Sequence, residues 1–279
     1  VLPSHVDVLK TPDLTRRKSK RPNWPFGPAG SELSFLDNLS DGMDKTNFAY
    51  KGICANPPEI TKRGIQRGNY AQIHRKAWLE VSDKYHRYGN NLRSYYRSLE
   101  KLSFPTNQFF HWLHSKGEPA GQPLPNLDDC PRSVLDSDTV LYINNPEVTD
   151  GYALDIKCTS EDGQGRVIDV DGNSVITGPE GWILVLRDNV MYGAEKITSI
   201  SGHSKQRFHH SSFFGGKAVA SAGIIITDKE GFLVRLYPHS GHYRPGESHM
   251  QRMLFFLHRK GVNLRTFEMD TQQFRHVSR

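Results

Sequence analysis

The run AGIIITDKEGFLVRL at residues 222–236 decides the fold. Apolar, mostly β-branched side chains fill Ala222–Thr227, the polar turn Asp228–Gly231 follows, and a second apolar run covers Phe232–Leu236. Two such runs separated by a short turn that contains glycine predict an antiparallel hairpin. Because no segment of helix length separates them, the pattern excludes a βαβ unit at this place.

The same period of two extends upstream of this hairpin, and polar turns separate the runs. The further strands that it predicts are Val140–Ile143, Tyr152–Cys158, Arg166–Val170, Trp182–Arg187 and Val190–Tyr192. Downstream, Ser248–Lys260 has helical spacing and is followed by Gly261, a residue typical of the position after a helix end. Val262–Met269 is predicted to add a last strand.

Helical spacing also precedes the strands, from about Tyr70 to Lys101, where Ile73, Ala77 and Val81 recur at intervals of four. We therefore expect an α+β fold, with an N-terminal arm and helices in front. A twisted antiparallel β-sheet or partly closed barrel follows, with a C-terminal helix packed on it.

Composition excludes several classes of protein. The 279 residues contain 36% hydrophobic residues and no stretch near the ~20 apolar residues of a membrane-spanning helix, so we expect no membrane partner. Three cysteines (Cys54, Cys130 and Cys158), none in a CxxC pair, exclude a disulfide scaffold and a cysteine-rich zinc site. Free thiols favour the cytoplasm or the nucleus. Secretion stays open, because the chain begins with Val1 rather than with a methionine.

The positive charge is concentrated near the N-terminus. The net charge is +6, and over residues 1–75 lysine and arginine outnumber aspartate and glutamate by 12 to 7. We expect residues 1–69 to form a basic, proline-rich and partly disordered arm, and residues 70–279 to form the α+β globular domain. Nucleic acid is an unlikely partner in this interpretation, because the rest of the chain is almost neutral.

Two histidine-bearing runs are the candidates for a functional site. They are residues 208–216, FHHSSFFGG, and residues 237–247, YPHSGHYRPGE. The hairpin between them brings both to one edge of the sheet, so His210, Ser211, His242 and Tyr243 should lie near each other. Their spacing lacks a metal-binding pair on a helix, and we expect no metal. A Ser–His nucleophile and a purely structural hydrogen-bond network are the alternatives.

A more specific alternative is an enzyme or ligand-binding domain that resembles ADP-ribosyltransferases and uses NAD. His210, Tyr243 and Glu247 would then be catalytic, with Glu247 stabilising a cationic transition state. The ligand-binding residues would be Ser211, Ser212, Arg93, Ser240, His242 and Arg244. Outside this alternative we expect no cofactor, and we favour a protein that is not an enzyme.

The segment from Ile65 to Arg75 has the frame of an IQ motif, a basic amphipathic helix that a calmodulin lobe grips. Ile65 and Gln66 open the frame and Arg75 closes it, whereas Tyr70 and Ala71 replace its central Arg-Gly. An ordinary helix start is the alternative interpretation.

Sequence stretches typical of one known family recur from about His74 to Glu268, over about 70% of the chain. They are Trp78–Glu80, His86–Leu92, Tyr95-Tyr96, Phe109–Leu113, Pro131–Leu135, Tyr192-Gly193, Phe208–Gly216, Ala222-Gly223, Tyr237–Pro245 with Glu247, Phe256-Leu257 and Gly261–Leu264. Over these stretches the chain resembles the plant IQM proteins, the IQ-motif-containing calmodulin-binding family, and their fungal and other microbial relatives.

The resemblance implies a calmodulin-linked protein-interaction module, with a cluster of His, Ser and Tyr residues of unknown role. It implies calmodulin or another acidic protein as partner, with Ile65, Gln66, Arg75 and Trp78 as the calmodulin-binding residues. It implies no particular reaction.

Overall fold

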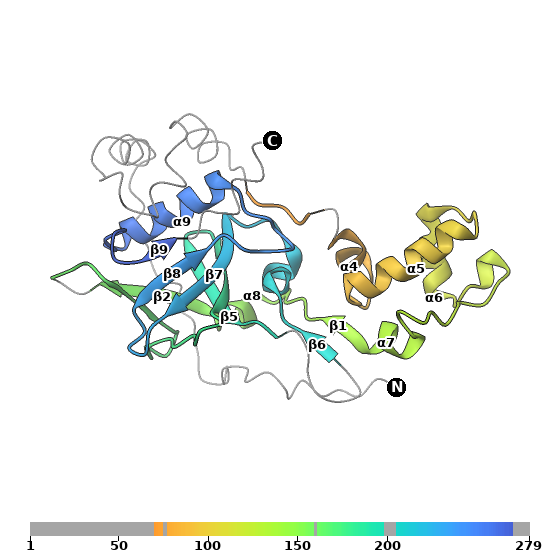
Figure 1. Ribbon diagram of the computed structural model, residues 1–279, viewed down its shortest axis with the longest axis horizontal. Helices are drawn as coiled ribbons and strands as arrows, with labels where there is room; N and C mark the ends of the chain where they lie inside the picture. The colour runs from red at the N-terminus through yellow and green to blue at the C-terminus, as the bar shows by residue number, and fades with distance from the viewer. Residues whose placement is uncertain (1–69, 75–76, 159–160, 198–204, 270–279) are drawn as a thin grey trace.

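The computed structural model describes residues 70–74, 77–158, 161–197 and 205–269 (Figure 1). The predicted arm, residues 1–69, lies outside the described residues. The helices are α4 (Trp78–Ser82), α5 (Gly89–Lys101), η3 (Thr106–Gln108), α6 (Phe109–His114), η4 (Glu118–Ala120), α7 (Arg132–Ser137), α8 (Pro146–Asp150), η5 (His210–Gly216) and α9 (Glu247–Arg259). The strands are β1 (Asp138–Val140), β2 (Ala153–Cys158), β3 (Gly165–Ile168), β4 (Trp182–Arg187), β5 (Val190–Glu195), β6 (Lys205–Arg207), β7 (Ser221–Thr227), β8 (Leu233–Tyr237) and β9 (Glu268–Met269).

A curled seven-stranded sheet forms the larger part of the described chain, in the order β3-β2-β5-β4-β7-β8-β9. All neighbouring strands are antiparallel except β8 and β9, which run parallel. The predicted hairpin is confirmed as β7 and β8, with a register shift between Ile226 and Thr227. The expected α+β class, with helices, a curled sheet and a C-terminal helix, is likewise confirmed.

Both faces of the sheet are covered, which is why β4 is apolar at successive positions. Leu184 and Leu186 belong to the core under α9, whose Met253 and Leu257 pack on that face (Figure 1). The alternate residues of β4 belong to a second core on the opposite face, together with Phe213 from η5. Because successive side chains of a strand point to opposite faces of the sheet, β4 contributes residues to both cores.

The helices α4 to α7 form a smaller part of the molecule beside the sheet (Figure 1). Leu92, Tyr95 and Leu99 of α5 are fully buried at spacings of three and four, in a core that also holds Trp112 of α6. The expected helical pattern from Tyr70 to Lys101 is interrupted more than the sequence suggested, because α4 has only five residues.

A buried ion pair explains the interruption between α4 and α5. Asp83 follows α4 with an extended backbone, and its carboxylate accepts hydrogen bonds from the Arg87 guanidinium and the Arg87 backbone N–H. Between them, His86 has a positive φ of 48°. Gly89 is the first residue of α5.

Several contacts join the helical part to the sheet. Strands β1 and β6 pair in parallel between the two parts (Figure 1). Ahead of α4, Ala71 forms a bridge with Val219, and the His74 N–H donates to the His242 carbonyl at 2.7 Å. The chain that enters α4 is thus hydrogen-bonded to two distant segments of the sheet part.

Two of the predicted strands contribute only one or two residues to the observed strands. Val140–Ile143 contributes only Val140 to β1, and Val262–Met269 contributes only its last two residues to β9. Turns around Asn263, whose carbonyl accepts from both the backbone and the hydroxyl of Thr266, occupy the remainder of the second segment. Within the described ranges, no helix combines the length and the apolar character that a bilayer span requires.

Candidate functional site

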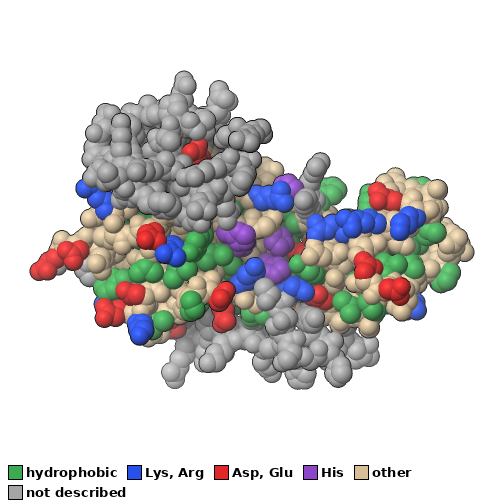
Figure 2. All heavy atoms as spheres, viewed as in Figure 1, with side chains coloured by type: hydrophobic (Ala, Val, Ile, Leu, Met, Phe, Trp, Pro, Cys, Tyr) green, Lys and Arg blue, Asp and Glu red, His purple; other side chains and the backbone are tan. Residues whose placement is uncertain are grey.

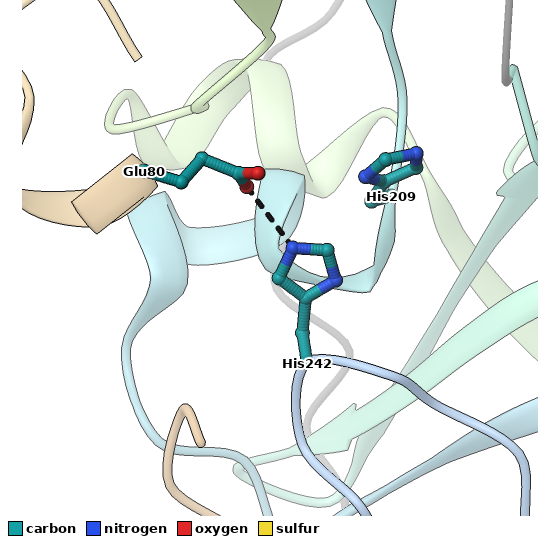
Figure 3. Close-up of side chains that lie close together, drawn as sticks. All are labelled: Glu80, His209 and His242. Atoms are coloured by element: carbon teal, nitrogen blue, oxygen red, sulfur yellow. Dashed lines mark hydrogen bonds and ion pairs between the residues drawn. The ribbon is translucent and has the colours of Figure 1, made fainter. Parts of the chain in front are cut away.

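Glu80, His209 and His242 converge where the helical part meets the sheet (Figure 3). Glu80 comes from α4, His209 follows β6, and His242 lies on the loop between β8 and α9. One potential ligand atom from each residue lies within 4.8 Å of the other two. On the face shown in Figure 2, histidine side chains gather midway along the molecule, with Lys and Arg side chains on either side. We call these three residues the Glu-His-His trio.

The Glu80 carboxylate is only 1% exposed, and both of its oxygens are engaged. Oε2 accepts the Gly89 backbone N–H at 3.0 Å, so the first residue of α5 fixes one side of the group. Oε1 accepts the Tyr142 hydroxyl at 2.9 Å and lies 3.0 Å from Nε2 of His242. These partners compensate for the cost of burying a carboxylate and fix its orientation.

A tight turn presents His242. The Ser240 hydroxyl accepts the Tyr243 N–H at 3.2 Å, and the Ser240 carbonyl accepts the Arg244 N–H at 2.8 Å. Arg244 has a φ of 45°, in the left-handed region that reverses the chain direction. The His74 backbone N–H also donates to the His242 carbonyl. The Ser240 turn and His74 together fix the His242 backbone, and the His242 ring points at Glu80 (Figure 3).

The His209 ring is buried, at 6% exposed, and lies 5.2 Å from the His242 ring between centroids. Its backbone N–H donates to the Ser212 hydroxyl at 2.9 Å, which fixes the start of η5. Among the described residues, its Nδ1 has no hydrogen-bond partner. Burial is the largest cause that lowers the pKa of His209, and the charge of His242 is the second; together they lower it to about 3. The His209 ring is therefore neutral at physiological pH.

Tyr142 contacts the trio through the hydrogen bond that its hydroxyl donates to Glu80. Burial, and then the charge of Glu80, raises the pKa of the Tyr142 hydroxyl, and the Ser211 hydroxyl close by opposes that shift. The ring stacks on His86 at 4.2 Å. Tyr142 therefore stays protonated and donates to Glu80. The Ser211 Oγ is fully buried and makes no well-formed hydrogen bond within the described part of the chain.

His210 and Tyr243, which were predicted to be catalytic, form hydrogen bonds with backbone carbonyls. His210 is 4% exposed, and its Nε2 lies 2.7 Å from the Gly223 carbonyl. Burial lowers the pKa of His210 to about 3, although the Gly223 contact opposes this, so a neutral ring donates the bond. Tyr243 is 3% exposed and donates to the Lys217 carbonyl at 2.7 Å. Burial also raises the pKa of Tyr243.

The remaining residues predicted to be catalytic or to bind a ligand are dispersed. Ser212 and Ser240 accept backbone N–H groups, as described above, and Glu247 is the half-buried first residue of α9. Arg244 is exposed and lies 3.4 Å from the His74 ring, whereas Arg93 lies on α5 in the helical part. The proposed use of His210, Tyr243 and Glu247 for NAD stays a prediction, and their observed contacts give it no added support.

Sequence reasoning missed Glu80 and Tyr142, and it preferred His210 to His209. Glu80 and His242 are separated by 162 positions, so no local spacing connects them. The one available signal was the place of Glu80 in the stretch Trp78-Leu79-Glu80, which carried the family resemblance.

A surface pocket lies at another place. It is formed at the β8–β9 edge by residues that include Arg235, Phe267 and Glu268. Two of these lining residues, Arg235 and Glu268, form an ion pair at 2.6 Å. It is lined by none of the residues predicted from the two histidine-bearing runs.

Comparisons with known proteins agree with the resemblance. A sequence model of the IQ motif-containing protein middle domain matches residues 159–250, which include His209 and His242. The chain is 31% identical over 211 residues to the IQ domain-containing protein IQM5 of Arabidopsis thaliana, a match that covers 75% of this chain and 39% of IQM5. It is 35% identical over 198 residues to IQM3 of the same plant, covering 69% of this chain and 39% of IQM3. The chain belongs to the IQM family.

This IQM chain spans about two fifths of the length of those curated relatives. No solved structure matches it significantly. The relatives found are plant proteins, so the expected fungal and microbial relatives stay a prediction. Within the IQM chain, the trio combines two histidines inside the matched middle domain with a glutamate outside it.

The predicted calmodulin-binding residues are only partly within the structure. Ile65, Gln66 and Arg75 lie outside the described residues. Trp78, the first residue of α4, is 68% exposed.

Proposed function

We propose that this IQM chain is a calmodulin-linked interaction protein. The observation that carries the proposal is the exposure of Trp78, three positions beyond the end of the IQ-like frame. A tryptophan side chain that is 68% exposed leaves a large apolar surface in water. Tryptophan is also among the residues that dominate binding energy when an interface covers them.

Features of the neighbouring chain support calmodulin as the partner. Tyr70, inside the IQ-like frame, is 42% exposed, and Tyr85 after α4 is 50% exposed. The basic excess of residues 1–75 suits a strongly acidic protein. The family name refers to an IQ motif, and such motifs present an apolar anchor and basic residues to one calmodulin lobe.

Calorimetric titration of the full chain with calmodulin, in calcium and again in a chelator, tests this proposal. We expect binding in at least one condition. Replacing Trp78 by Ala should weaken it about 30-fold, the equivalent of a hot-spot loss of about 2 kcal/mol. A double variant, Ile65→Ala with Gln66→Ala, should weaken it as well. The matched control is Ile176→Ala, because Ile176 is 57% exposed on a different part of the surface.

Two results would contradict the proposal. One is a full chain that does not bind calmodulin in either condition. The other is equal binding by wild type, Trp78→Ala and the Ile65/Gln66 double variant, since calmodulin would then contact some other surface.

A further inference from the structure

We propose that the Glu-His-His trio is a binding site for a divalent transition-metal ion, with zinc as the preferred ion. Two imidazoles and one carboxylate are a ligand set that proteins use for zinc. Here they come from three segments far apart in the sequence, and one potential ligand atom of each lies within 4.8 Å of the others. This inference is independent of calmodulin binding.

The distances suit an ion between the three groups. Bonds of about 2.0–2.1 Å in a tetrahedral site separate the ligand atoms by about 3.3 Å. Nε2 of His242 and Oε1 of Glu80 are 3.0 Å apart, and the three potential ligand atoms, one from each residue, all lie within 4.8 Å of one another. Small shifts of the side chains, without backbone rearrangement, would therefore bring all three groups into coordination.

The hydrogen bonding of the trio is incomplete without such a ligand. The His209 Nδ1 is buried and has no partner among the described residues, an arrangement that is costly to leave unsatisfied. The His209 ring packs edge-on against Tyr88, at 5.9 Å between centroids, and lies near His242. A buried neutral imidazole held beside a carboxylate offers a lone pair to a cation.

The groups behind the trio orient it as the outer shell of a metal site does. Glu80 Oε2 accepts a hydrogen bond from the Gly89 N–H, and Oε1 accepts one from the Tyr142 hydroxyl. Such outer partners fix the direction of a ligating carboxylate. The nearby cation Arg207 is neutralised by a two-point contact with Asp138, at 2.6 and 2.8 Å, which limits its repulsion of a metal ion.

The coordination would have two consequences. Three protein ligands leave the fourth tetrahedral position for water or another small ligand, the arrangement of reactive rather than purely structural zinc. In addition, the ion would join α4 to the β6–η5 segment and to the β8–α9 loop, so occupancy should stabilise the contact between the helical part and the sheet.

The test uses the full, untagged chain, stripped with a chelator and titrated with zinc chloride by calorimetry. We expect one equivalent bound more tightly than about 1 μM. Cobalt(II) should give the intense visible absorption of a tetrahedral site with the same stoichiometry. Zinc should raise the melting temperature of the wild type.

Variants localise the binding. His209→Ala, His242→Ala and Glu80→Gln should each weaken zinc binding at least about 100-fold and abolish the thermal shift. Tyr142→Phe, which removes only an orienting hydroxyl, should weaken it about 10- to 100-fold. His111→Ala is the control, because His111 is exposed on α6. The His242 side chain is 15% exposed on a loop, so we expect His242→Ala to disturb the fold least. This variant keeps the test valid if the variants at the more buried Glu80 and His209 fail to fold.

A wild-type chain that binds no zinc, cobalt or iron(II) would overturn the proposal. Zinc binding that His242→Ala and His111→Ala retain equally would overturn it too, because the ion would then be on other surface histidines. Preference for iron(II) over zinc, with the same stoichiometry and the same variant pattern, would support the site and identify a different occupant.

Discussion

Replacing Asp83 by Asn should strongly destabilise the protein, because this carboxylate holds a buried guanidinium. Asp83 is 0% exposed and Arg87 is 4% exposed. Nε of Arg87 lies 2.8 Å from Oδ2, Nη2 lies 3.0 Å from Oδ1, and the Arg87 backbone N–H donates to Oδ2 at 3.0 Å. The same carboxylate contacts Nε2 of His114 at 3.0 Å.

The size of the loss follows from these contacts. Removing one partner of a buried ion pair costs about 3–5 kcal/mol, because the remaining charge stays buried. Asparagine keeps one acceptor oxygen and the volume of the side chain, so we expect about 3 kcal/mol. Asp136, at 3.1 Å from Arg87, is 67% exposed, and solvent screens its attraction too strongly to compensate.

Urea unfolding at pH 7 measures the effect as a lower transition midpoint with an unchanged slope. The control is Asp136→Asn, which should cost less than about 1 kcal/mol because that carboxylate is exposed. An equally small loss for Asp83→Asn would refute the reasoning, since it would mean that Arg87 does not depend on this partner.

The pH dependence gives a second measurement of the same interaction. Burial opposes ionisation of Asp83, but the hydrogen bonds from Arg87 and His114 together outweigh it and lower the pKa below 3.8. A depressed pKa in the folded state means that the stabilisation is complete above the unfolded value of 3.8 and is lost as the pH falls below it. The wild type should therefore lose stability more steeply below about pH 3.8 than Asp83→Asn does, and parallel curves would contradict this.

Three further predictions concern the cores and a thiol. Leu99→Ala should lower the free energy of unfolding by about 2–5 kcal/mol in urea, because Leu99 is fully buried, whereas Leu102→Ala at a 38% exposed position should cost much less. Tyr243→Phe should cost about 1–3 kcal/mol, since it leaves the Lys217 carbonyl without its donor, and an unchanged transition midpoint would argue against that role. Burial raises the pKa of Cys130 to about 11, so peptide mass spectrometry should find Cys130 unlabelled by a thiol reagent at pH 8 in the native protein and labelled after unfolding.

The sheet could be predicted from the sequence because its signals are local. The short apolar run Trp182–Arg187 and the polar turn at Asp228–Gly231 each specify a strand or a turn within a few residues, and both predictions are confirmed. The C-terminal helix, expected at Ser248–Lys260, is found as α9 one residue earlier. The segment before α4 was misread because Ile73 and Ala77 have helical spacing, although Ala71 pairs with Val219 as a bridge.

The trio could not be predicted in the same way, because its geometry depends on long-range contacts. His209 and His210 are adjacent and chemically identical, and only the start of η5 decides that one ring faces Glu80 while the other donates to Gly223. Glu80 resembles any acidic residue of a short helix until Gly89 and Tyr142 are seen to bind it. Sequence spacing could not show that this carboxylate is buried with such partners and lies against two histidines from the other part of the molecule. That arrangement is therefore the feature that most directly indicates a site.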